Sequence, residues 1–226
     1  MPRDAITVTQ LSNEGTTPIA QTAGVAANDL SVAVSSGDLV FVEIENVGSA
    51  SAIATFETPV EHDGIPVNDV DITVPAPTQA ALTTALAGVN NDLVFTAVPR
   101  GKAGNNITVQ YVVAGLSTAL SVVVTGTAIV VNVATDGAGA PTSTAAQVET
   151  ALEANASVAA LVTIANAAAN DGTGIVAALA ATALSGGEPS FRIEKLYQLG
   201  TFLQSDGKVY INLTVDNTLK FRAYKM

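Results

Sequence analysis

Residues 206–224 read DGKVYINLTVDNTLKFRAY, and this stretch decides the fold class. In residues 208–215 and 219–224 apolar side chains stand at every second position. Alternation with a period of two predicts strands with one buried face. The pairs Asp206-Gly207 and Asp216-Asn217 tolerate the positive φ angles of tight turns. The stretch therefore predicts a turn, a strand, a second turn and a second strand.

The same pattern appears near the other end of the chain. Residues 5–11, 39–46 and 69–74 alternate or are rich in β-forming side chains, and Ser, Asp and Gly turns separate them. Phe41 stands in the middle of residues 39–46, so we expect it to help anchor the core. Seven or eight short strands with regular turns predict a mainly β protein with a β-sandwich or jelly-roll-like domain.

The middle of the chain has a different composition from the two ends. Residues 81–187 hold only two of the ten aromatic residues and two of the nine basic ones. Pro- and Gly-rich stretches bound this region, at 74–78 and 185–189, and such residues end regular structure. The sequence therefore predicts a discontinuous host domain, residues 1–77 plus 188–226, that carries an inserted small α+β domain, residues 78–187.

The inserted region mixes strand and helix signals. Thr144 followed by Gln147 is a capping-box pattern, which predicts a helix that ends at Asn155. A second short helix is expected over residues 158–161. Strands are expected over residues 93–98, 107–113, 120–124 and 128–134. Residues 163–168 and 176–184 fit either a strand or a helix, and two more strands are the favoured interpretation.

Composition excludes several classes of function. The chain has 226 residues, no Cys and one His, and its formal net charge is −11. Disulfides, thiolate metal sites and cysteine catalysis are excluded, and one chain cannot supply two imidazoles to a metal. Because phosphate affinity depends on Lys and Arg, we expect neither nucleic acid nor a membrane as a partner. The most apolar segment, residues 157–169, is shorter than the about 18 residues that a membrane-spanning helix requires.

Two acidic clusters resemble parts of functional sites. Glu61-His62-Asp63 contains a carboxylate that could orient an imidazole, but Asp63-Gly64 predicts an exposed turn. Asp69 and Asp71 lie two apart and could offer oxygen ligands to Ca²⁺, but the sequence around them lacks the known Ca²⁺-loop pattern. Exposed turn and strand residues are the simpler interpretation of both clusters.

Two glycine pairs resemble fragments of phosphate-binding loops, at residues 101–104 and 171–174. Neither has the full motif, which favours turns. No pair of carboxylates in a glycosidase-like arrangement is apparent either. We therefore predict no enzyme activity, no cofactor, and no catalytic, cofactor-binding or metal-binding residue.

The host-domain segments resemble a known family when they are read in order. A strand ending in Asn46-Val-Gly48 precedes a threonine-rich strand, Thr58-Pro59, the Asp63-Gly64 turn, Val74-Pro75 and finally Ser205-Asp-Gly-Lys-Val-Tyr210. This order resembles the small all-β head-decoration (cement) proteins of tailed bacteriophages. Those proteins run to about half this length and lack an insert.

The inserted region resembles a repeat module of phage head, tail and sheath proteins. The turn Gly104-Asn-Asn-Ile-Thr-Val109 is its most distinctive mark, followed by residues 143–148 and Asn170-Asp-Gly-Thr-Gly174. A decoration protein with an added surface module implies that the insert faces outward from the particle.

The two resemblances together imply a virion structural protein on the outer surface of the capsid. Its partner would be the major capsid protein, whose subunits it would bridge and stabilise, and related proteins imply a homotrimer. Arg3, Arg192 and Lys195 of the host domain are candidate contacts to acidic capsid loops. The alternative is an adhesive module of a phage tail or fibre that binds a host receptor or carbohydrate.

Overall fold

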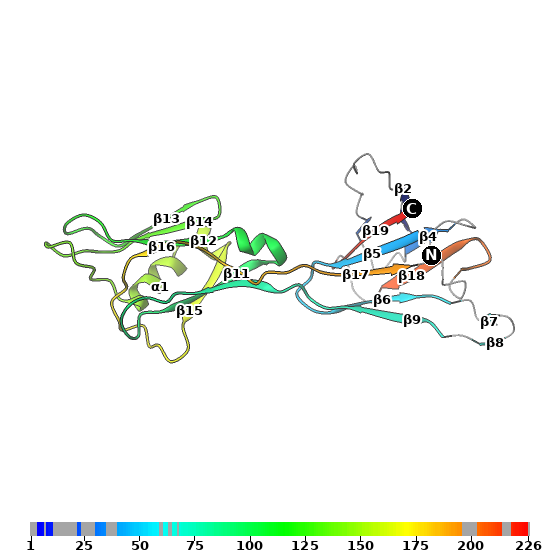
Figure 1. The fold of residues 1–226 in the computed structure, drawn as a ribbon, viewed down its shortest axis with the longest axis horizontal. Coiled ribbons are helices and arrows are strands. Elements are labelled where there is room, and N and C mark those ends of the chain that lie inside the picture. Colours follow the sequence, from blue (N-terminus) through cyan, green and yellow to red (C-terminus); the bar gives the residue numbers. More distant parts are fainter. Residues whose placement is uncertain are drawn as a thin grey trace. The chain divides into compact units, whose positions relative to one another are not determined.

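The computed structural model divides into two compact units (Figure 1). Unit 1 holds Met1–Pro77 and Pro189–Met226, and unit 2 holds Thr78–Glu188. Unit 1 is thus built from both ends of the chain, and unit 2 from the continuous segment between them. The residues that the structure describes are 4–6, 8–10, 22–23, 30–34, 40–58, 61–62, 65–66, 68–195, 203–213 and 218–225.

The first sheet of unit 1 is centred on β18. Its strands, in spatial order, are β1 (Asp4–Ile6), β4 (Leu30–Ala33), β18 (Lys208–Leu213), β6 (Ala52–Phe56) and β9 (Val70–Val74). β1 and β4 pair in parallel, and the other neighbours pair antiparallel. β9 is an edge strand, which explains why Val70, though in step with the buried Val74, is 40% exposed.

The second sheet of unit 1 joins the two ends of the chain. Its strands, in order, are β17 (Ser190–Lys195), β5 (Val40–Asn46), β19 (Leu219–Lys225) and β2 (Val8–Gln10), and β3 (Thr22–Ala23) also pairs with β19. β5 lies between β17 and β19 and pairs antiparallel with both. A separate hairpin consists of β7 (Glu61–His62) and β8 (Ile65–Pro66).

Both sheets of unit 1 contribute one face to a shared hydrophobic core. The predicted alternation of the last two strands is confirmed, because their apolar positions are buried. These are Val209, Ile211 and Leu213 of β18 and Leu219, Phe221 and Ala223 of β19. Phe56 and Phe221 supply the large buried rings.

Phe41 is not part of this core, contrary to the expectation from its mid-strand position. In β5 the buried residues are Val40, Val42 and Ile44, so the alternating position of Phe41 lies on the opposite side of the sheet. There its ring stacks on that of Tyr224, with the ring centroids 5.4 Å apart and the planes at 16°. The β-branched residues of β5 face the core, and the aromatic ring covers the outer surface of the strand.

Residues 5–11 do not form the single strand that their alternation predicted. β1 pairs with β4 in the first sheet, whereas β2 pairs with β19 in the second. Ile6 is buried in the core, and Val8 packs against the same core from the other sheet. A segment that passes from one sheet to the other beside a shared core keeps its apolar alternation. The pattern alone therefore does not distinguish one continuous strand from two short strands in different sheets.

Unit 2 contains two sheets around a second hydrophobic core. One sheet has the order β10 (Gln79–Thr83), β11 (Leu93–Arg100) and β15 (Val162–Asn166). The other has the order β13 (Ser121–Thr125), β14 (Ala128–Asn132), β12 (Thr108–Val112) and β16 (Leu179–Ala183). The six predicted strands of this region are confirmed, with ends that shift by a few residues, and β10 was not predicted.

The predicted capping box of unit 2 is confirmed at the start of α1 (Ala145–Glu153). The Thr144 hydroxyl accepts a hydrogen bond from the Gln147 backbone N–H, and the Gln147 side chain accepts one from the Thr144 N–H. α1 ends at Glu153, before the predicted Asn155, because Asn155 instead caps the next helix, α2 (Ala156–Ala159). Val148 and Leu152 are the buried apolar residues of the α1 stripe.

The two ends of unit 2 are hydrogen-bonded to each other. The Thr78 N–H donates to the Glu188 carbonyl (3.0 Å), and the Glu188 N–H donates to the Thr78 hydroxyl (2.7 Å). The Asn105 side chain both donates to and accepts from the backbone of Gly187, at 2.9 Å each. Asn105 belongs to the 3-10 helix Gly101–Asn106 and to the Gly-Asn-Asn turn of the sequence. The chain therefore enters and leaves unit 2 at neighbouring points.

Among the residues described, there is no helix with the length and apolar character that a membrane span requires.

Candidate functional site

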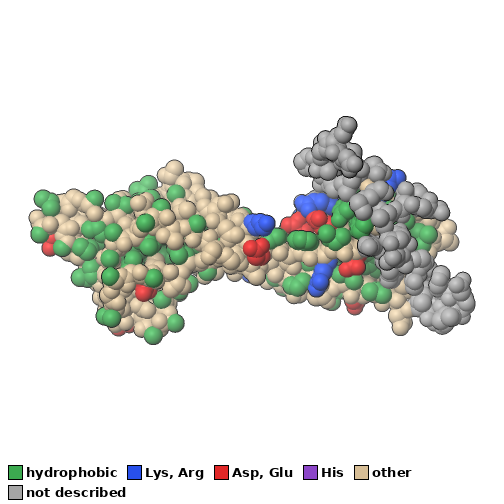
Figure 2. Space-filling model, in the orientation of Figure 1, with side chains coloured by type: hydrophobic (Ala, Val, Ile, Leu, Met, Phe, Trp, Pro, Cys, Tyr) green, Lys and Arg blue, Asp and Glu red, His purple; other side chains and the backbone are tan. Residues whose placement is uncertain are grey.

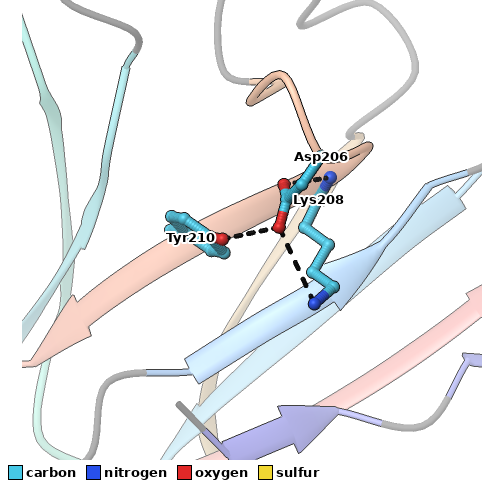
Figure 3. A network of polar contacts seen from close by, with 3 residues as sticks. All are labelled: Asp206, Lys208 and Tyr210. Atoms are coloured by element: carbon cyan, nitrogen blue, oxygen red, sulfur yellow. Dashed lines mark hydrogen bonds and ion pairs between the residues drawn. The ribbon is translucent and has the colours of Figure 1, made fainter. Parts of the chain in front are cut away.

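The turn before β18 carries a connected group of three polar side chains (Figure 3). The Asp206 carboxylate accepts hydrogen bonds from the Tyr210 hydroxyl (2.7 Å) and from the Lys208 backbone N–H (3.2 Å). The Lys208 ammonium lies 3.7 Å from the same carboxylate. Gly207 has φ of +77°, the left-handed conformation that a glycine adopts without strain. The Ser205–Tyr210 segment of the sequence motif is thus a turn locked by its own side chains.

This turn has no arrangement for acid catalysis. The Tyr210 hydrogen bond lowers the pKa of Asp206, and the backbone N–H and the charge of Lys208 lower it further. A carboxylate with a lowered pKa is ionised at neutral pH and has no proton to donate as a general acid. The network holds the turn in shape and keeps a fixed negative charge at its tip.

Three further carboxylates lie near the other strands of the first sheet. Glu57 accepts a hydrogen bond from the Asn212 amide (2.8 Å). Asp71 accepts one from the Thr55 hydroxyl (2.7 Å), and Asp69 accepts one from the Thr58 N–H (2.8 Å). We call Glu57, Asp69, Asp71 and Asp206 the acidic face. Each of these carboxylates accepts a hydrogen bond from a different donor.

Asp69 and Asp71 of the acidic face do not form the Ca²⁺ site that their spacing in the sequence would permit. The two carboxylates accept hydrogen bonds from different threonines, Thr58 and Thr55. Ca²⁺ requires six to eight oxygen ligands around one point. Within the described ranges, no group of three or more His, Cys, Asp or Glu side chains is placed to hold a metal ion.

The Glu61-His62-Asp63 cluster falls partly outside the described residues. Glu61 and His62 form β7, in which they pair with Pro66 and Ile65 of β8. Their backbones are therefore in a two-stranded hairpin, and Asp63 lies outside the described residues.

The two glycine pairs form close backbone contacts inside unit 2. The carbonyls of Gly172 and Gly174 accept hydrogen bonds from the N–H groups of Ala146 and Ala145, at the start of α1. These N–H groups are the ones that a helix would offer to a phosphate, and here they already have partners. A Cβ at Gly104 would lie 2.8 Å from that of Ala97, so close packing requires a glycine there.

A second polar and aromatic surface covers the outer side of β17, β5 and β19. The strand register places Glu45 between Phe191 and Lys220, Glu43 between Ile193 and Arg222, and Phe41 beside Tyr224. We call these eight residues the aromatic face. Figure 2 shows acidic, basic and hydrophobic side chains together on unit 1, whereas the visible side of unit 2 has few charged side chains.

Arg222 lies at the centre of the aromatic face. Its guanidinium donates a hydrogen bond to Glu43 and lies 3.6 Å from the Glu45 carboxylate. Partial burial raises the pKa of Tyr224, and the negative charge of Glu43 raises it further, so the hydroxyl stays protonated at neutral pH. Sequence reasoning missed this face because Arg222 and Glu43 are 179 positions apart. The sequence signal for this face was the placing of like charges at alternate positions, which are acidic in residues 43–45 and basic in residues 220–222.

The three candidate capsid contacts have different places in the structure. Arg192 lies on β17, pairs with Ile44, and has an exposed side chain. Lys195 ends β17 and pairs with Phe41, and its side chain lies outside the described part. Arg3 lies outside the described residues. The described structure therefore brings only Arg192 and the Lys195 backbone to one strand.

Asn46, in the Asn-Val-Gly motif, connects three parts of unit 1. Its side-chain amide donates to the carbonyls of Ala50 (2.8 Å), Val74 (2.9 Å) and Pro75 (3.0 Å), and its carbonyl accepts from the Gly48 N–H (2.8 Å). The residue is 1% exposed. The motif thus closes the turn after β5 and fastens it to the end of β9.

Comparison of the chain with protein-family models, curated proteins and solved structures found no match.

Proposed function

We propose that the protein is a structural component of a tailed-bacteriophage virion that binds the outer surface of the capsid. In this proposal unit 1 is a β-sandwich or jelly-roll-like host domain that contacts the major capsid protein. Unit 2 is an inserted α+β module that points away from the shell. The observation that carries the proposal is the ordered motif pattern of unit 1, from Asn46-Val-Gly48 to Ser205–Tyr210.

The roles of the motif residues support this interpretation over an enzyme. Asn46 fastens β5 to the end of β9, and Asp206 with Tyr210 holds the turn before β18. These residues stabilise the turns of a β domain and do not converge on a reacting atom. A protein whose distinctive residues maintain its shape suits a structural role in an assembly.

The physical basis of capsid stabilisation is mass action. A decoration protein that bridges neighbouring capsid subunits adds an interface that must break before the shell opens. Binding to the assembled state alone stabilises that state by RT ln(1 + [L]/Kd). The net charge of −11 disfavours contact with packaged nucleic acid or with an anionic membrane, so the outside of the shell is the consistent location.

We also propose that the protein assembles as a homotrimer on the capsid. Three copies around a local three-fold axis can each contact a different capsid subunit, so one trimer bridges several of them. Closed cyclic symmetry of this kind uses the same pair of surfaces at every contact.

The test is co-sedimentation of the purified full-length protein with undecorated, expanded capsids. We expect saturable binding at a copy number set by the capsid lattice, and a higher temperature of capsid disruption when the protein is bound. Absence of co-sedimentation, or binding without saturation, would contradict the proposal. Unexpanded capsids are the matched control, because the contact surface of a mature lattice is absent from them.

The alternative is an adhesive module of a tail or fibre, and one observation favours it. Val89 (80% exposed), Leu116 (68%) and Ile175 (51%) are aliphatic residues on loops of unit 2. The Asn91 amide donates to the Ile175 carbonyl (3.0 Å), which holds two of these loops together. Rigid loops with exposed apolar side chains are a common form of binding surface. Adsorption of the isolated protein to host cells, without binding to capsids, would support this alternative.

A further inference from the structure

We propose that the edge strand β13 of unit 2 pairs with β13 of a second copy of this chain. In this arrangement the two strands lie antiparallel across a two-fold axis at Val123, and the four-stranded sheets of the two copies become one continuous sheet. The pairing requires only a second chain, so it is independent of the proposed attachment of unit 1 to a capsid.

The other edge strands of unit 2 are blocked or irregular. Unit 2 is described throughout, and the edges of its two sheets are β10, β15, β13 and β16. The outer side of β10 is occupied, because Ala81 exchanges backbone hydrogen bonds with Ser185 (2.8 and 3.0 Å). Helices α1 and α2 pack against β15, and its Asn166 amide donates to Glu149 of α1 (3.2 Å). The pairing of β16 with β12 has a register shift, and such irregularities hinder the addition of a further strand.

β13 (Ser121–Thr125) has none of these protections. Its register with β14 is continuous over the whole strand, and it contains no charged residue and no proline. No strand of the described chain pairs with its outer edge (Figure 1). A regular edge of this kind presents unpaired N–H and C=O groups to another strand.

The backbone of β13 is arranged to pair with itself. The two-residue turn Gly126-Thr127 joins β13 to β14, and Thr125 pairs with Ala128 across it. The pair beside a two-residue turn exchanges hydrogen bonds, and bonding then alternates along the ladder. The N–H and C=O groups of Val122 and Val124 therefore point to the outer edge. If Val122 pairs with Val124 of the second copy, and the reverse, all of these groups are satisfied at once.

The side chains match in the same register. Val123 then lies opposite Val123 of the second copy, and this side chain is 50% exposed in the single chain. Val122 and Val124 face the core but remain partly exposed, whereas Ile129 and Val131 of the neighbouring β14 are fully buried. A second β13 would cover these valines on the side where β14 does not, and would pair the exposed valines with each other.

The distribution of charge identifies a second copy as the partner. Residues 103–135, which include β12, β13 and β14, hold no charged residue. Two chains of net charge −11 repel each other, and an uncharged surface is where that repulsion is smallest. Such a surface also has nothing that would attract a strongly charged partner. Asp136, the first charge after this run, accepts hydrogen bonds within its own loop from the N–H groups of Ala138 and Ala140 (2.8 and 2.9 Å).

Helix α1 also contacts β13, but its acidic side chains lie toward β15. Glu149 accepts a hydrogen bond from Asn166 of β15 (3.2 Å). Glu153 follows four residues later and lies on the same side of the helix. These two carboxylates are therefore directed away from the edge at which the copies meet.

The first experiment is disulfide capture, which is direct because the chain has no cysteine. In the proposed register position 123 forms a non-hydrogen-bonded pair, with the Cα atoms about 4.5 Å apart, a separation that a disulfide can bridge. The test variant is Val123→Cys in the full-length protein. The matched control is Val98→Cys, on the interior strand β11, where the side chain is 44% exposed.

Both cysteine variants are oxidised with oxidised glutathione, and linked dimers are followed with time on non-reducing gels. Thermal unfolding verifies that each variant is folded. We expect dimers of the Val123→Cys protein to form at least about tenfold faster than those of the control, because pairing holds the two thiols together. Equal rates would overturn the inference.

An exchange of charges tests the two-fold axis. Val123→Lys and Val123→Glu each place like charges opposite each other, so we expect either variant alone to sediment as a smaller species than the wild type at the same concentration. An equimolar mixture of the two should regain association, since Lys then faces Glu, and Val98→Lys should associate as the wild type does. A mixture that does not regain association, or a wild type no larger than the variants, would contradict the pairing.

Other partners for β13 give different results. Disulfides that form only between the Val123→Cys and Ala181→Cys proteins would show head-to-tail pairing of β13 with β16, and would overturn the two-fold arrangement. Loss of capsid binding by Val123→Lys, without linked dimers of Val123→Cys, would assign β13 to a capsid strand instead.

Capsid co-sedimentation separates this inference from the proposed function. Linked dimers of Val123→Cys together with absence of capsid binding would support the inference and contradict the capsid proposal. Capsid binding by a protein that forms no linked dimers would do the reverse.

Discussion

Tyr111 lies in β12 with its side chain 1% exposed, and its hydroxyl has no hydrogen-bond partner among the described residues. Burial raises the pKa of this hydroxyl, and the charge of Asp92 raises it further. A buried polar group without a partner loses its hydration and gains nothing in return. We therefore expect Tyr111→Phe to increase the free energy of unfolding of unit 2 by about 1 kcal/mol. Denaturant unfolding measures the change, and a decrease would mean that the hydroxyl has a partner in solution.

Tyr210→Phe is the contrasting change, because this hydroxyl donates to Asp206 at 2.7 Å. The hydrogen bond lowers the pKa of Asp206 in the folded state below its unfolded value. Its contribution to stability is therefore present above the unfolded pKa, about 3.9, and is lost as the pH falls through the folded pKa. We expect the variant to be less stable than wild type at pH 7 and the difference to vanish in acid. An NMR titration should show a higher pKa of Asp206 in the variant.

Asn46 is the residue of unit 1 whose chemistry is most constrained by its surroundings. Its amide donates to three backbone carbonyls, and a carboxylate at the same place could only accept. We expect Asn46→Asp to lower the free energy of unfolding of unit 1 by about 3 kcal/mol or more, because a buried charge would face unpaired carbonyls. The exposed Asn106→Asp of unit 2 is the control, and similar losses in both variants would contradict the argument.

At the scale of the element, the start of α1 offers a quantitative test of the capping box. Thr144 and Gln147 exchange two hydrogen bonds between side chain and backbone. We expect Thr144→Ala to lower the free energy of unfolding by about 1 kcal/mol, since the first turn loses a bonded N–H group. Gln147→Ala should cost less in the Thr144→Ala background than alone. Strictly additive losses in this double-mutant cycle would show that the two bonds are independent.

Sequence patterns predicted β5, β18 and β19 of unit 1, but they did not predict the interior strand β4 or the edge strand β17. β18 and β19 each bury one face, so their apolar residues alternate. β17 lies at the edge of the second sheet, and its residues 191–194 alternate between apolar and charged side chains, but the charged ones occupy the core-facing side; this segment was not assigned to a strand from its sequence. β10 of unit 2 was missed because Ala80 and Ala81 are buried and exposed respectively but have the same side chain. Alternation is informative only where the two sides of a strand differ in polarity.

The sequence predicted candidate surfaces formed by neighbouring residues but not those formed by residues from distant parts of the chain. The Asp206-Gly207 turn is a local feature, and the sequence predicted it. The aromatic face instead depends on pairing of β5 with β17 and β19, from the other end of the chain. Phe41 illustrates the difference: its neighbours Val40 and Val42 made the strand predictable, but only the pairing places its ring on Tyr224. Short-range patterns predict turns and strands, and long-range register determines which side chains meet.

At the scale of the whole molecule, the division into two units follows the punctuation of the sequence. Pro77 ends the first segment of unit 1, and Pro189 begins the second. Between them the ends of unit 2 are tied by the bonds of Thr78 to Glu188 and of Asn105 to Gly187. Each unit also has its own hydrophobic core. These features argue that the two units fold independently of each other.

Removal of residues 78–188, with a short Gly-Ser link between Pro77 and Pro189, tests this independence. The link need only be short, because the Thr78 N–H and the Glu188 carbonyl are 3.0 Å apart in the intact chain. Since the unit 1 core has no contribution from unit 2, we expect the shortened protein to unfold cooperatively, and residues 78–188 expressed alone to do the same. Calorimetry of both fragments and of the full chain measures this, and a fragment without a cooperative transition would contradict it.

If the shortened protein also co-sediments with capsids as the full chain does, attachment belongs to unit 1. Binding by residues 78–188 alone would transfer that role to unit 2.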